Sequence, residues 1–187
     1  MTQIIEKTIF EQITLNNHSN GKFETVDAGI LILSDAPFGA ELDSLYAPLP
    51  KFAGGADARK HLTVQLELSD DAASGLRRLD EACEAASSSL GLWSPLVTLR
   101  DGRQFSKVRL LIENERATTF RIEEGELQSG WEALGPLLVQ HRNLGGAKLK
   151  AAIRPMYIWI VSGKRGITLG LEQMVIAQPT QRATLDH

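Results

Sequence analysis

A run of basic residues without acids marks the second half of the chain. Between Gln140 and Arg165 no Asp or Glu occurs, whereas this segment contains the bases Arg142, Lys148, Lys150, Arg154, Lys164 and Arg165. Segments of positive charge attract polyanions such as nucleic acids, because each ammonium or guanidinium group that neutralises a phosphate releases a bound counterion. A solvated face of mixed charge would also contain such bases. The chemistry that this segment favours is therefore phosphate binding.

Aromatic side chains lie among these bases and beside a second group of bases. Tyr157 and Trp159 belong to the basic run, and Phe105 precedes Lys107 and Arg109 at alternate positions. Proteins that bind single-stranded nucleic acid combine bases along the phosphates with rings on which nucleobases stack. A ring in such a domain is also often part of the core. The candidate binding residues are Phe105, Lys107, Arg109, Trp131, Lys148, Lys150, Arg154, Tyr157, Trp159, Lys164 and Arg165.

The net charge of the whole chain hides this asymmetry. The 187 residues carry 20 Lys and Arg against 23 Asp and Glu, a net charge of -3, whereas DNA-binding domains are usually basic. Residues 1–95 contain 14 acids and 7 bases, while residues 96–187 contain 9 acids and 13 bases. A charge difference between halves points to a polyanion as the ligand of the basic half.

Motifs for catalysis are scarce. The histidines have no metal-site spacing. Cys83, the single cysteine, falls on the apolar stripe of a helical pattern, which is typical of a buried structural thiol. Gly163-Lys164 lacks the rest of a P-loop, since Ile158 stands where the first Gly is needed and Arg165 where Ser or Thr is needed. We expect no enzyme activity, no cofactor and no metal.

Acid pairs and targeting signals add nothing to a catalytic interpretation. Asp70-Asp71 is more simply the acidic first turn of a helix, and Glu123-Glu124 is more simply a turn. A single cysteine fits a reducing compartment. The first residues lack a secretory signal pattern, and no apolar run approaches the roughly 18 residues that span a membrane. We expect a cytoplasmic protein.

The elements that must position the candidate residues are mostly strands. Apolar residues spaced as in a helix follow the N-cap Ser69 and predict one substantial helix as far as Leu90. Asp101-Gly102 predicts a hairpin turn. We expect strands over Thr25–Ser34, His61–Leu68, Leu96–Leu99, Phe105–Glu113, Ala117–Ile122, Ala147–Val161 and Ile167–Ala177, with irregular chain over 35–60 and a long loop, including a short helix at most, over 127–146.

Pro155 interrupts the longest predicted strand. A proline cannot donate a hydrogen bond to a sheet, so it is tolerated only at an edge or at a bulge. A bulge inserts one extra residue and reverses the side-chain alternation beyond it. The faces on which Tyr157 and Trp159 lie therefore depend on this proline.

Three stretches of sequence carry a family likeness. They are HLTVQLELSDDAASGLRRLDEACEAA (61–86), a strand followed by an Asp-started helix; PLVTLRDG (95–102); and RPMYIWIVSGKRGITLGLEQMV (154–175), a hairpin whose Gly-Lys-x-Gly turn leads into an Ile-x-Leu-Gly-Leu strand. Together they resemble the single-stranded DNA-binding proteins of tailed bacteriophages and prophages, which are built on an OB-fold barrel.

The resemblance implies a fold and a role. The implied fold is mostly β with one substantial helix, an OB-fold-like five-stranded barrel with extra hairpins and long loops, in one domain over 1–178 with a short flexible tail at 179–187. The implied role is sequence-independent binding of single-stranded DNA in phage replication or recombination. Further partners would be a second copy of the chain and replication or recombination proteins, with no membrane. Many proteins with this role end in an acidic tail, whereas 179–187 contains one acid, which puts recruitment of partners by the tail in doubt.

Two other functions remain open at the level of sequence. The acidic first half would suit a phage-encoded β-domain that binds protein, as a virion component or as a DNA-mimicking inhibitor. A divalent-metal nuclease would need carboxylates converging on the basic face, and the segment 140–165 has none.

Overall fold

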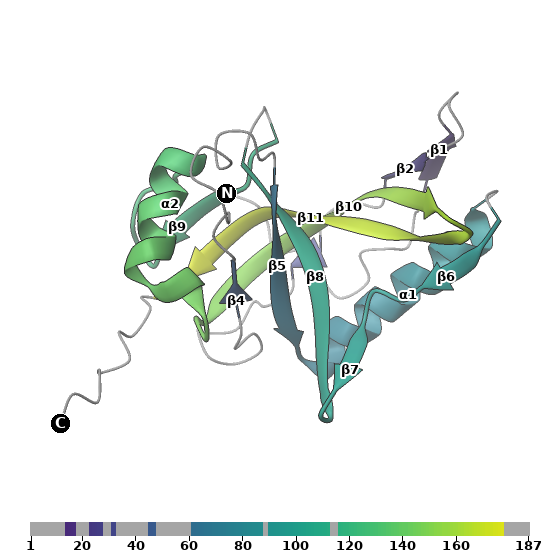
Figure 1. The fold of residues 1–187 in the computed structure, drawn as a ribbon, viewed down its shortest axis with the longest axis horizontal. Helices are drawn as coiled ribbons and strands as arrows, with labels where there is room; N and C mark the ends of the chain where they lie inside the picture. Colours follow the sequence, from purple (N-terminus) through teal and green to yellow (C-terminus); the bar gives the residue numbers. More distant parts are fainter. Residues whose placement is uncertain are drawn as a thin grey trace.

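The computed structural model describes residues 14–17, 23–27, 31–32, 45–47, 61–87, 90–112 and 116–177. The elements are β1 Thr14–Asn17, β2 Phe23–Asp27, β3 Leu31–Ile32, β4 Leu45–Tyr46, β5 His61–Leu68, α1 Asp70–Ala86, β6 Leu92–Ser94, β7 Thr98–Arg100, β8 Arg103–Leu111, β9 Thr119–Ile122, α2 Trp131–Gln140, the 3-10 helix η1 Arg142–Leu144, β10 Leu149–Val161 and β11 Lys164–Ile176 (Figure 1). The predicted tail at 179–187 and most of the expected irregular segment 35–60 lie outside the described residues.

The strands form one sheet, which confirms the mostly β, OB-like class. Its main path runs β1-β2-β10-β11-β8-β5-β4, while β3, β6, β7 and β9 pair with strands on this path. Among the described residues the two end strands, β1 and β4, do not pair with each other, so this sheet stays open where a closed five-stranded barrel was expected.

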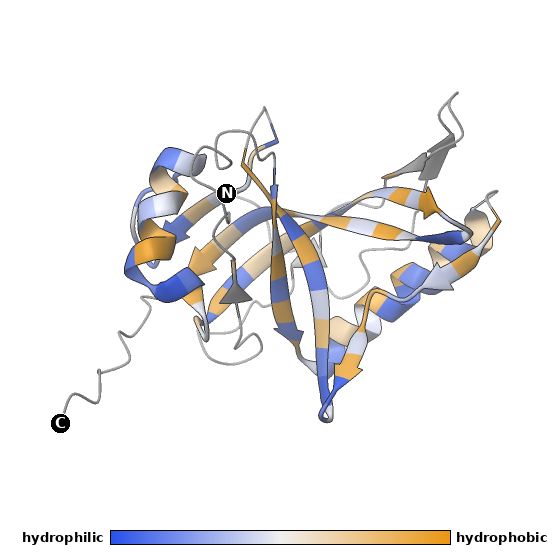
Figure 2. Cartoon of the chain, viewed as in Figure 1, coloured by the Kyte–Doolittle hydropathy of each residue, from blue (hydrophilic) through white to orange (hydrophobic). Residues whose placement is uncertain are grey.

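The pair β5–β8 follows directly from the alternating sequence. Leu62, Val64, Leu66 and Leu68 are buried, while the residues between them are half-buried or exposed. Hydrophobic and hydrophilic residues alternate along the ribbon of β5 (Figure 2). The hairpin turn predicted at Asp101-Gly102 joins β7 to β8, and both turn residues have positive φ, 52° and 75°. Such a two-residue turn matches the twist of the strands that it connects.

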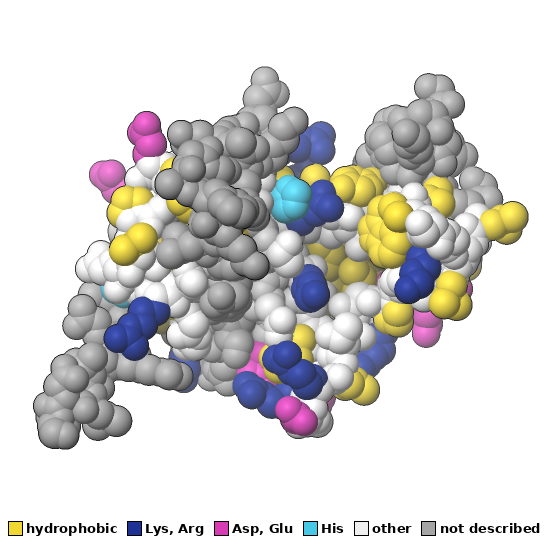
Figure 3. Space-filling model, viewed as in Figure 1, with side chains coloured by type: hydrophobic (Ala, Val, Ile, Leu, Met, Phe, Trp, Pro, Cys, Tyr) yellow, Lys and Arg dark blue, Asp and Glu magenta, His cyan; other side chains and the backbone are white. Residues whose placement is uncertain are grey.

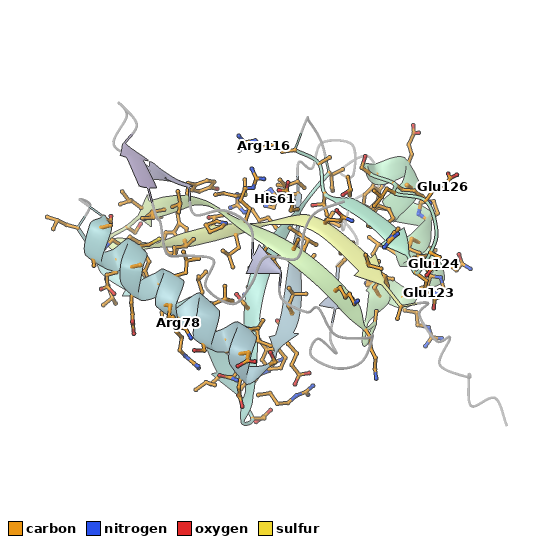
Figure 4. The ribbon with its side chains drawn as sticks, turned by 180° about the vertical axis from the view of Figure 1, so that it is seen from behind. His61, Arg78, Arg116, Glu123, Glu124 and Glu126 are labelled. Atoms are coloured by element: carbon orange, nitrogen blue, oxygen red, sulfur yellow. The ribbon has the colours of Figure 1, made fainter. Side chains whose placement is uncertain are left out.

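Helix α1 covers the back of the sheet. Its N-cap Ser69 accepts a hydrogen bond from the backbone N–H of Ala72 over 3.2 Å, as the sequence predicts. Its apolar stripe is buried, including Cys83, which confirms the structural thiol. The rear view shows α1 in front of the sheet (Figure 4). Helix α1 therefore leaves the opposite face of the sheet uncovered.

Helix α2 is the main departure from the predicted elements. The segment 127–146 was expected to be a long loop with a short helix at most, because it contains Gly130, Gly135 and Pro136. A ten-residue helix forms instead, with Leu134, Leu137 and Leu138 buried among the core residues. Burial of these leucines at helical spacing outweighs one missing backbone hydrogen bond at the proline.

Candidate nucleic-acid interface

An extra residue in β10 determines which of its side chains share a face. Pro155 pairs with Leu169 and Tyr157 pairs with Thr168, so Met156 has no partner of its own in β11. With regular alternation Arg154 and Tyr157 would lie on opposite faces of the strand. The bulge places both on the face away from α1, together with Trp159. The interruption predicted at Pro155 is this bulge.

The register of β8, β11 and β10 brings one arginine from β8 and one from β10 into the same row across the sheet. Gly170 of β11 pairs with Arg109 on one side and with Arg154 on the other. Gly170 places no side chain between the two guanidinium groups. The side chain of Met156 fills this space, since a Cβ atom on Gly170 would lie 2.8 Å from Sδ of Met156.

The two arginines of this row have different partners. Nη1 of Arg109 donates a hydrogen bond to the hydroxyl of Tyr157 over 2.6 Å, and the guanidinium carbon lies 5.7 Å from the centre of that ring. Nη2 of Arg154 donates to Oε1 of Glu172 over 3.0 Å. Arg109 donates to a neutral hydroxyl, whereas a carboxylate compensates part of the charge of Arg154.

Trp159 occupies the next part of the same face. It pairs with Gly166, and a Cβ atom there would lie 2.8 Å from Cζ2 of the indole. The ring therefore lies against a strand position that only glycine leaves open. Trp159 and Tyr157 are both half-buried, so each ring is held by the sheet while part of it remains accessible.

We call this surface the basic-aromatic face; it consists of Lys107, Arg109, Arg154, Tyr157, Trp159 and Lys164. Lys107 and Lys164 are exposed. The neighbouring strand β5 places polar residues beside it, with Thr63 opposite Arg109 and Gln65 opposite Lys107. The front view shows Lys and Arg side chains interspersed with hydrophobic ones over β8 and the β10–β11 hairpin (Figure 3).

Phe105 does not offer a free ring on this face. It is only 5% exposed, and the guanidinium carbons of Arg100 and Arg103 lie 4.9 Å and 5.5 Å from its ring centre. The expectation that Phe105 stacks on a base is corrected, because other cations already cover its ring. Arg100 and Arg103 are bases that the sequence-based selection missed.

Arg165 lies on the opposite face of the hairpin. Its guanidinium carbon is 5.2 Å from the ring centre of Trp93, and its Nε donates to the carbonyl of Gly91 over 3.0 Å. Trp93 in turn donates from Nε1 to Asp80 of α1 over 2.9 Å. Lys164 and Arg165 both belong to β11, and alternation along this strand directs their side chains to opposite faces.

Trp131 is also apart from the basic-aromatic face. It begins α2, and its indole packs against Gly135 one turn later, where a Cβ atom would lie 3.0 Å from Cε2. Helix α2 lies at the end of the molecule away from the turn of the β10–β11 hairpin (Figure 1). The structure gives Trp131 a role in packing this helix onto the core.

Lys148 and Lys150 lie at the start of β10. Lys150 is on the same side of the strand as Arg154, in a row with Val175 and Arg121. Lys148 is exposed and precedes the strand. Arg121 is a further base that was missed, although its alternation with the buried Phe120 in a predicted strand marks it as facing the other way from the core.

The acids of the described chain lie mainly elsewhere. Glu123, Glu124 and Glu126 follow β9 beside α2 (Figure 4). Asp80 is buried under Trp93, and its carboxylate also accepts from the N–H of Leu96 over 2.8 Å. Burial raises the pKa of Asp80 to about 6, against the two hydrogen bonds, which lower it.

The described residues contain no cluster of three His, Cys, Asp or Glu side chains that could hold a metal ion. In the same part of the chain, neither helix combines the length and hydrophobicity that crossing a membrane requires.

Neither a family model nor a curated protein matches the chain. The single-stranded DNA-binding protein from bacteriophage Enc34, in its C-terminally truncated form, aligns with a TM-score of 0.51 and 14% identity over 89% of this chain and 95% of that one. The chain is folded like this phage single-stranded DNA-binding protein. At this identity the likeness establishes the fold alone.

Two further solved structures align over most of their length. The other Enc34 structure gives a TM-score of 0.46 and 11% identity over 94% of this chain and 97% of that one. The single-stranded DNA-binding protein gp2.5 of bacteriophage T7 gives 0.39 and 14% over 84% and 96%.

Proposed function

We propose that this chain binds single-stranded DNA without reading its sequence, through the basic-aromatic face, and that it catalyses no reaction. Its role would be protection of single strands in phage DNA replication or recombination, with residues 1–178 as one binding domain. The observation that carries the proposal is the row Arg109–Gly170–Arg154 with Tyr157 and Trp159 on the same face. The fold shared with the Enc34 protein supports it.

The Lys and Arg side chains of this face would neutralise phosphates. Neighbouring strands lie about 4.8 Å apart, so the backbones at Arg109 and Arg154, on either side of β11, are separated by roughly 10 Å. The two arginines have separate hydrogen-bond partners, Tyr157 and Glu172, so each would contribute its own phosphate contact. Lys107 and Lys164 are exposed and extend the positive charge in both directions, and Lys150 adds to it at the start of β10.

The aromatic rings of this face would stack on the nucleobases of the DNA strand. Tyr157 and Trp159 are held against the sheet with part of each ring accessible. Stacking on such a platform contributes about 1–3 kcal/mol per base and tolerates any base, because every base has a π-face. A duplex keeps its bases stacked on one another, so the same rings favour single strands.

A titration tests the function directly. A fluorescent oligo-dT of about 25 nucleotides, long enough to exceed one OB-fold site, is compared with a duplex of equal length at two salt concentrations with Mg²⁺ present. We expect tight binding of the single strand that weakens with salt. Absence of binding would reject the proposal and leave the protein-binding alternative, and cleavage of the DNA would indicate a nuclease.

A further inference from the structure

An exposed apolar row lies at the end of the β10–β11 hairpin. Leu92 of β6 pairs with Lys164 of β11, which pairs in turn with Val161 of β10. Leu92 is 71% exposed and Val161 is 61% exposed. The three side chains therefore form one continuous row in which a cation lies between two apolar groups.

This row belongs to the same face as Trp159. From Tyr157 to Val161 the pairing of β10 with β11 is uninterrupted, so Val161 and Trp159, two residues apart, point the same way. Lys164 and Gly166 are likewise two residues apart. The residue between them, Arg165, contacts Trp93 on the α1 side, which fixes the orientation of both neighbours. The apolar row is therefore the next row after Trp159 on the basic-aromatic face.

We propose that Leu92, Val161 and Lys164 form a further nucleotide subsite, at which one end of the bound DNA strand leaves the face. This proposal rests on the proposed function. The occupant must offer apolar surface to the two side chains and a negative charge to the lysine. A nucleotide has both, since the two faces of its base and the carbon atoms of its deoxyribose are apolar, while its phosphate is negatively charged. The row also directly continues the face on which the strand is proposed to lie.

Oligonucleotides of increasing length test this subsite. The double variant Leu92→Thr, Val161→Thr keeps side chains suited to strands while removing apolar surface. Its matched control is Leu99→Thr, Val139→Thr. Leu99 is 69% exposed and pairs with Gln104, whose amide donates to Asp70 of α1, so Leu99 lies on the α1 side of the sheet. Val139 is 68% exposed on α2. Neither residue is therefore on the proposed path of the DNA strand.

Affinities are measured for oligo-dT from about 4 to about 16 nucleotides, the range of site sizes for one OB fold. We expect the control to follow the wild type at every length. The double variant should match the wild type on the shortest oligonucleotides and stop gaining affinity one or two nucleotides earlier, with a plateau about five- to tenfold weaker. Lys164→Gln should reduce the salt dependence only on oligonucleotides long enough to reach the row.

Other outcomes would overturn the subsite while leaving the proposed function intact. One is a double variant that follows the wild type at every length. A loss that is equal at all lengths would also contradict a subsite at the end of the path. Sedimentation velocity of the same variants shows whether the row instead binds a second copy: a dimer that dissociates in the variant, with an unchanged length profile, would assign it to self-association. If the wild type binds no single strand, the proposed function itself fails.

Discussion

Arg109 of β8 and Tyr157 of β10 are joined by a hydrogen bond of 2.6 Å that reaches across β11, the strand between them. The bond exists because two features coincide: the bulge that turns Tyr157 to this face, and the parallel register of β8 with β11. It fixes a guanidinium group beside an aromatic ring. Tyr157 thus has two separable roles, as a ring for stacking and as the group that positions Arg109.

Substitution of Tyr157 separates these roles. Tyr157→Phe keeps the ring but removes the hydroxyl, so we expect single-strand affinity to fall about two- to fivefold, because Arg109 keeps its charge and loses only the bond that positions it, at a net cost of about 0.5–1 kcal/mol. Tyr157→Leu removes the ring as well and should cost about tenfold or more, as expected for a lost stacking contact. Fluorescence anisotropy with oligo-dT measures both. Wild-type affinity of the leucine variant would show that no base stacks on this ring.

Gly166 should be required for the position of Trp159. A methyl group at residue 166 would lie 2.8 Å from Cζ2 of the indole, closer than carbon atoms can approach, so Gly166→Ala must displace the ring. We expect a changed tryptophan fluorescence spectrum and weaker DNA binding. Gly145→Ala is the control, because its added Cβ atom would meet nothing closer than the Arg142 carbonyl at 3.7 Å. Equal behaviour of the two variants would contradict the packing of Trp159 on Gly166.

The salt dependence of binding counts the phosphate contacts. Five contacts, from Lys107, Arg109, Lys150, Arg154 and Lys164, predict a slope of log K against log salt of about -3.5, at about -0.7 for each contact on single strands. Lys107→Gln should make the slope shallower by about 0.7. Arg78→Gln provides the comparison, since Arg78 is exposed on α1, behind the sheet (Figure 4). An affinity independent of salt, or equal slopes for both variants, would exclude phosphate contacts at Lys107.

Glu172 should weaken DNA binding in the wild type. Its carboxylate lies 3.0 Å from Nη2 of Arg154 and adds a negative charge beside a proposed phosphate contact. Glu172→Gln retains the shape of the side chain and removes the charge. We expect affinity for oligo-dT to rise about two- to fivefold at low salt, with the gain decreasing as salt screens the charge. A fall in affinity would mean that the ion pair instead holds Arg154 in its binding position.

The sequence predicted the structure best where apolar residues recur with the period of a strand or of a helix. The alternation of His61–Leu68 and the capped repeat after Ser69 predicted β5 and α1 because each pattern permits one way of burying its apolar side chains. The length of helix α2 was underestimated because Gly135 and Pro136 signal a break, and only the surrounding core shows that its leucines are buried.

The candidate site was predictable in composition but not in assembly. The bases and rings of β8 and β10 could be selected from the sequence, and Pro155 indicated a bulge. The pairing of Gly170 with both Arg109 and Arg154 depends on the register of distant strands, which no local pattern encodes. For the same reason the sequence could not place Leu92 beside Lys164. Lys164 and Arg165 were not separated because the strand was predicted to begin at Ile167, whereas β11 begins at Lys164.

Asp80 makes the stability of the protein depend on pH. Burial raises the pKa of this carboxyl group from 3.8 to about 6, so the folded chain holds the proton more tightly than the unfolded chain. Between about pH 4 and pH 6 the unfolded state therefore binds fewer protons, and the free energy of unfolding falls as pH rises, by about 3 kcal/mol in total. The contribution is fully present below the unfolded pKa and is lost above about pH 6.

In Asp80→Asn this part of the pH dependence should disappear, at the cost of about 1 kcal/mol for one of the two hydrogen bonds from Trp93 and Leu96. Urea denaturation from pH 4 to pH 7 measures the difference, and a ¹³C carboxyl titration of Asp80 checks its cause. Parallel stability curves for the two proteins would show that Asp80 titrates alike in the folded and unfolded chains.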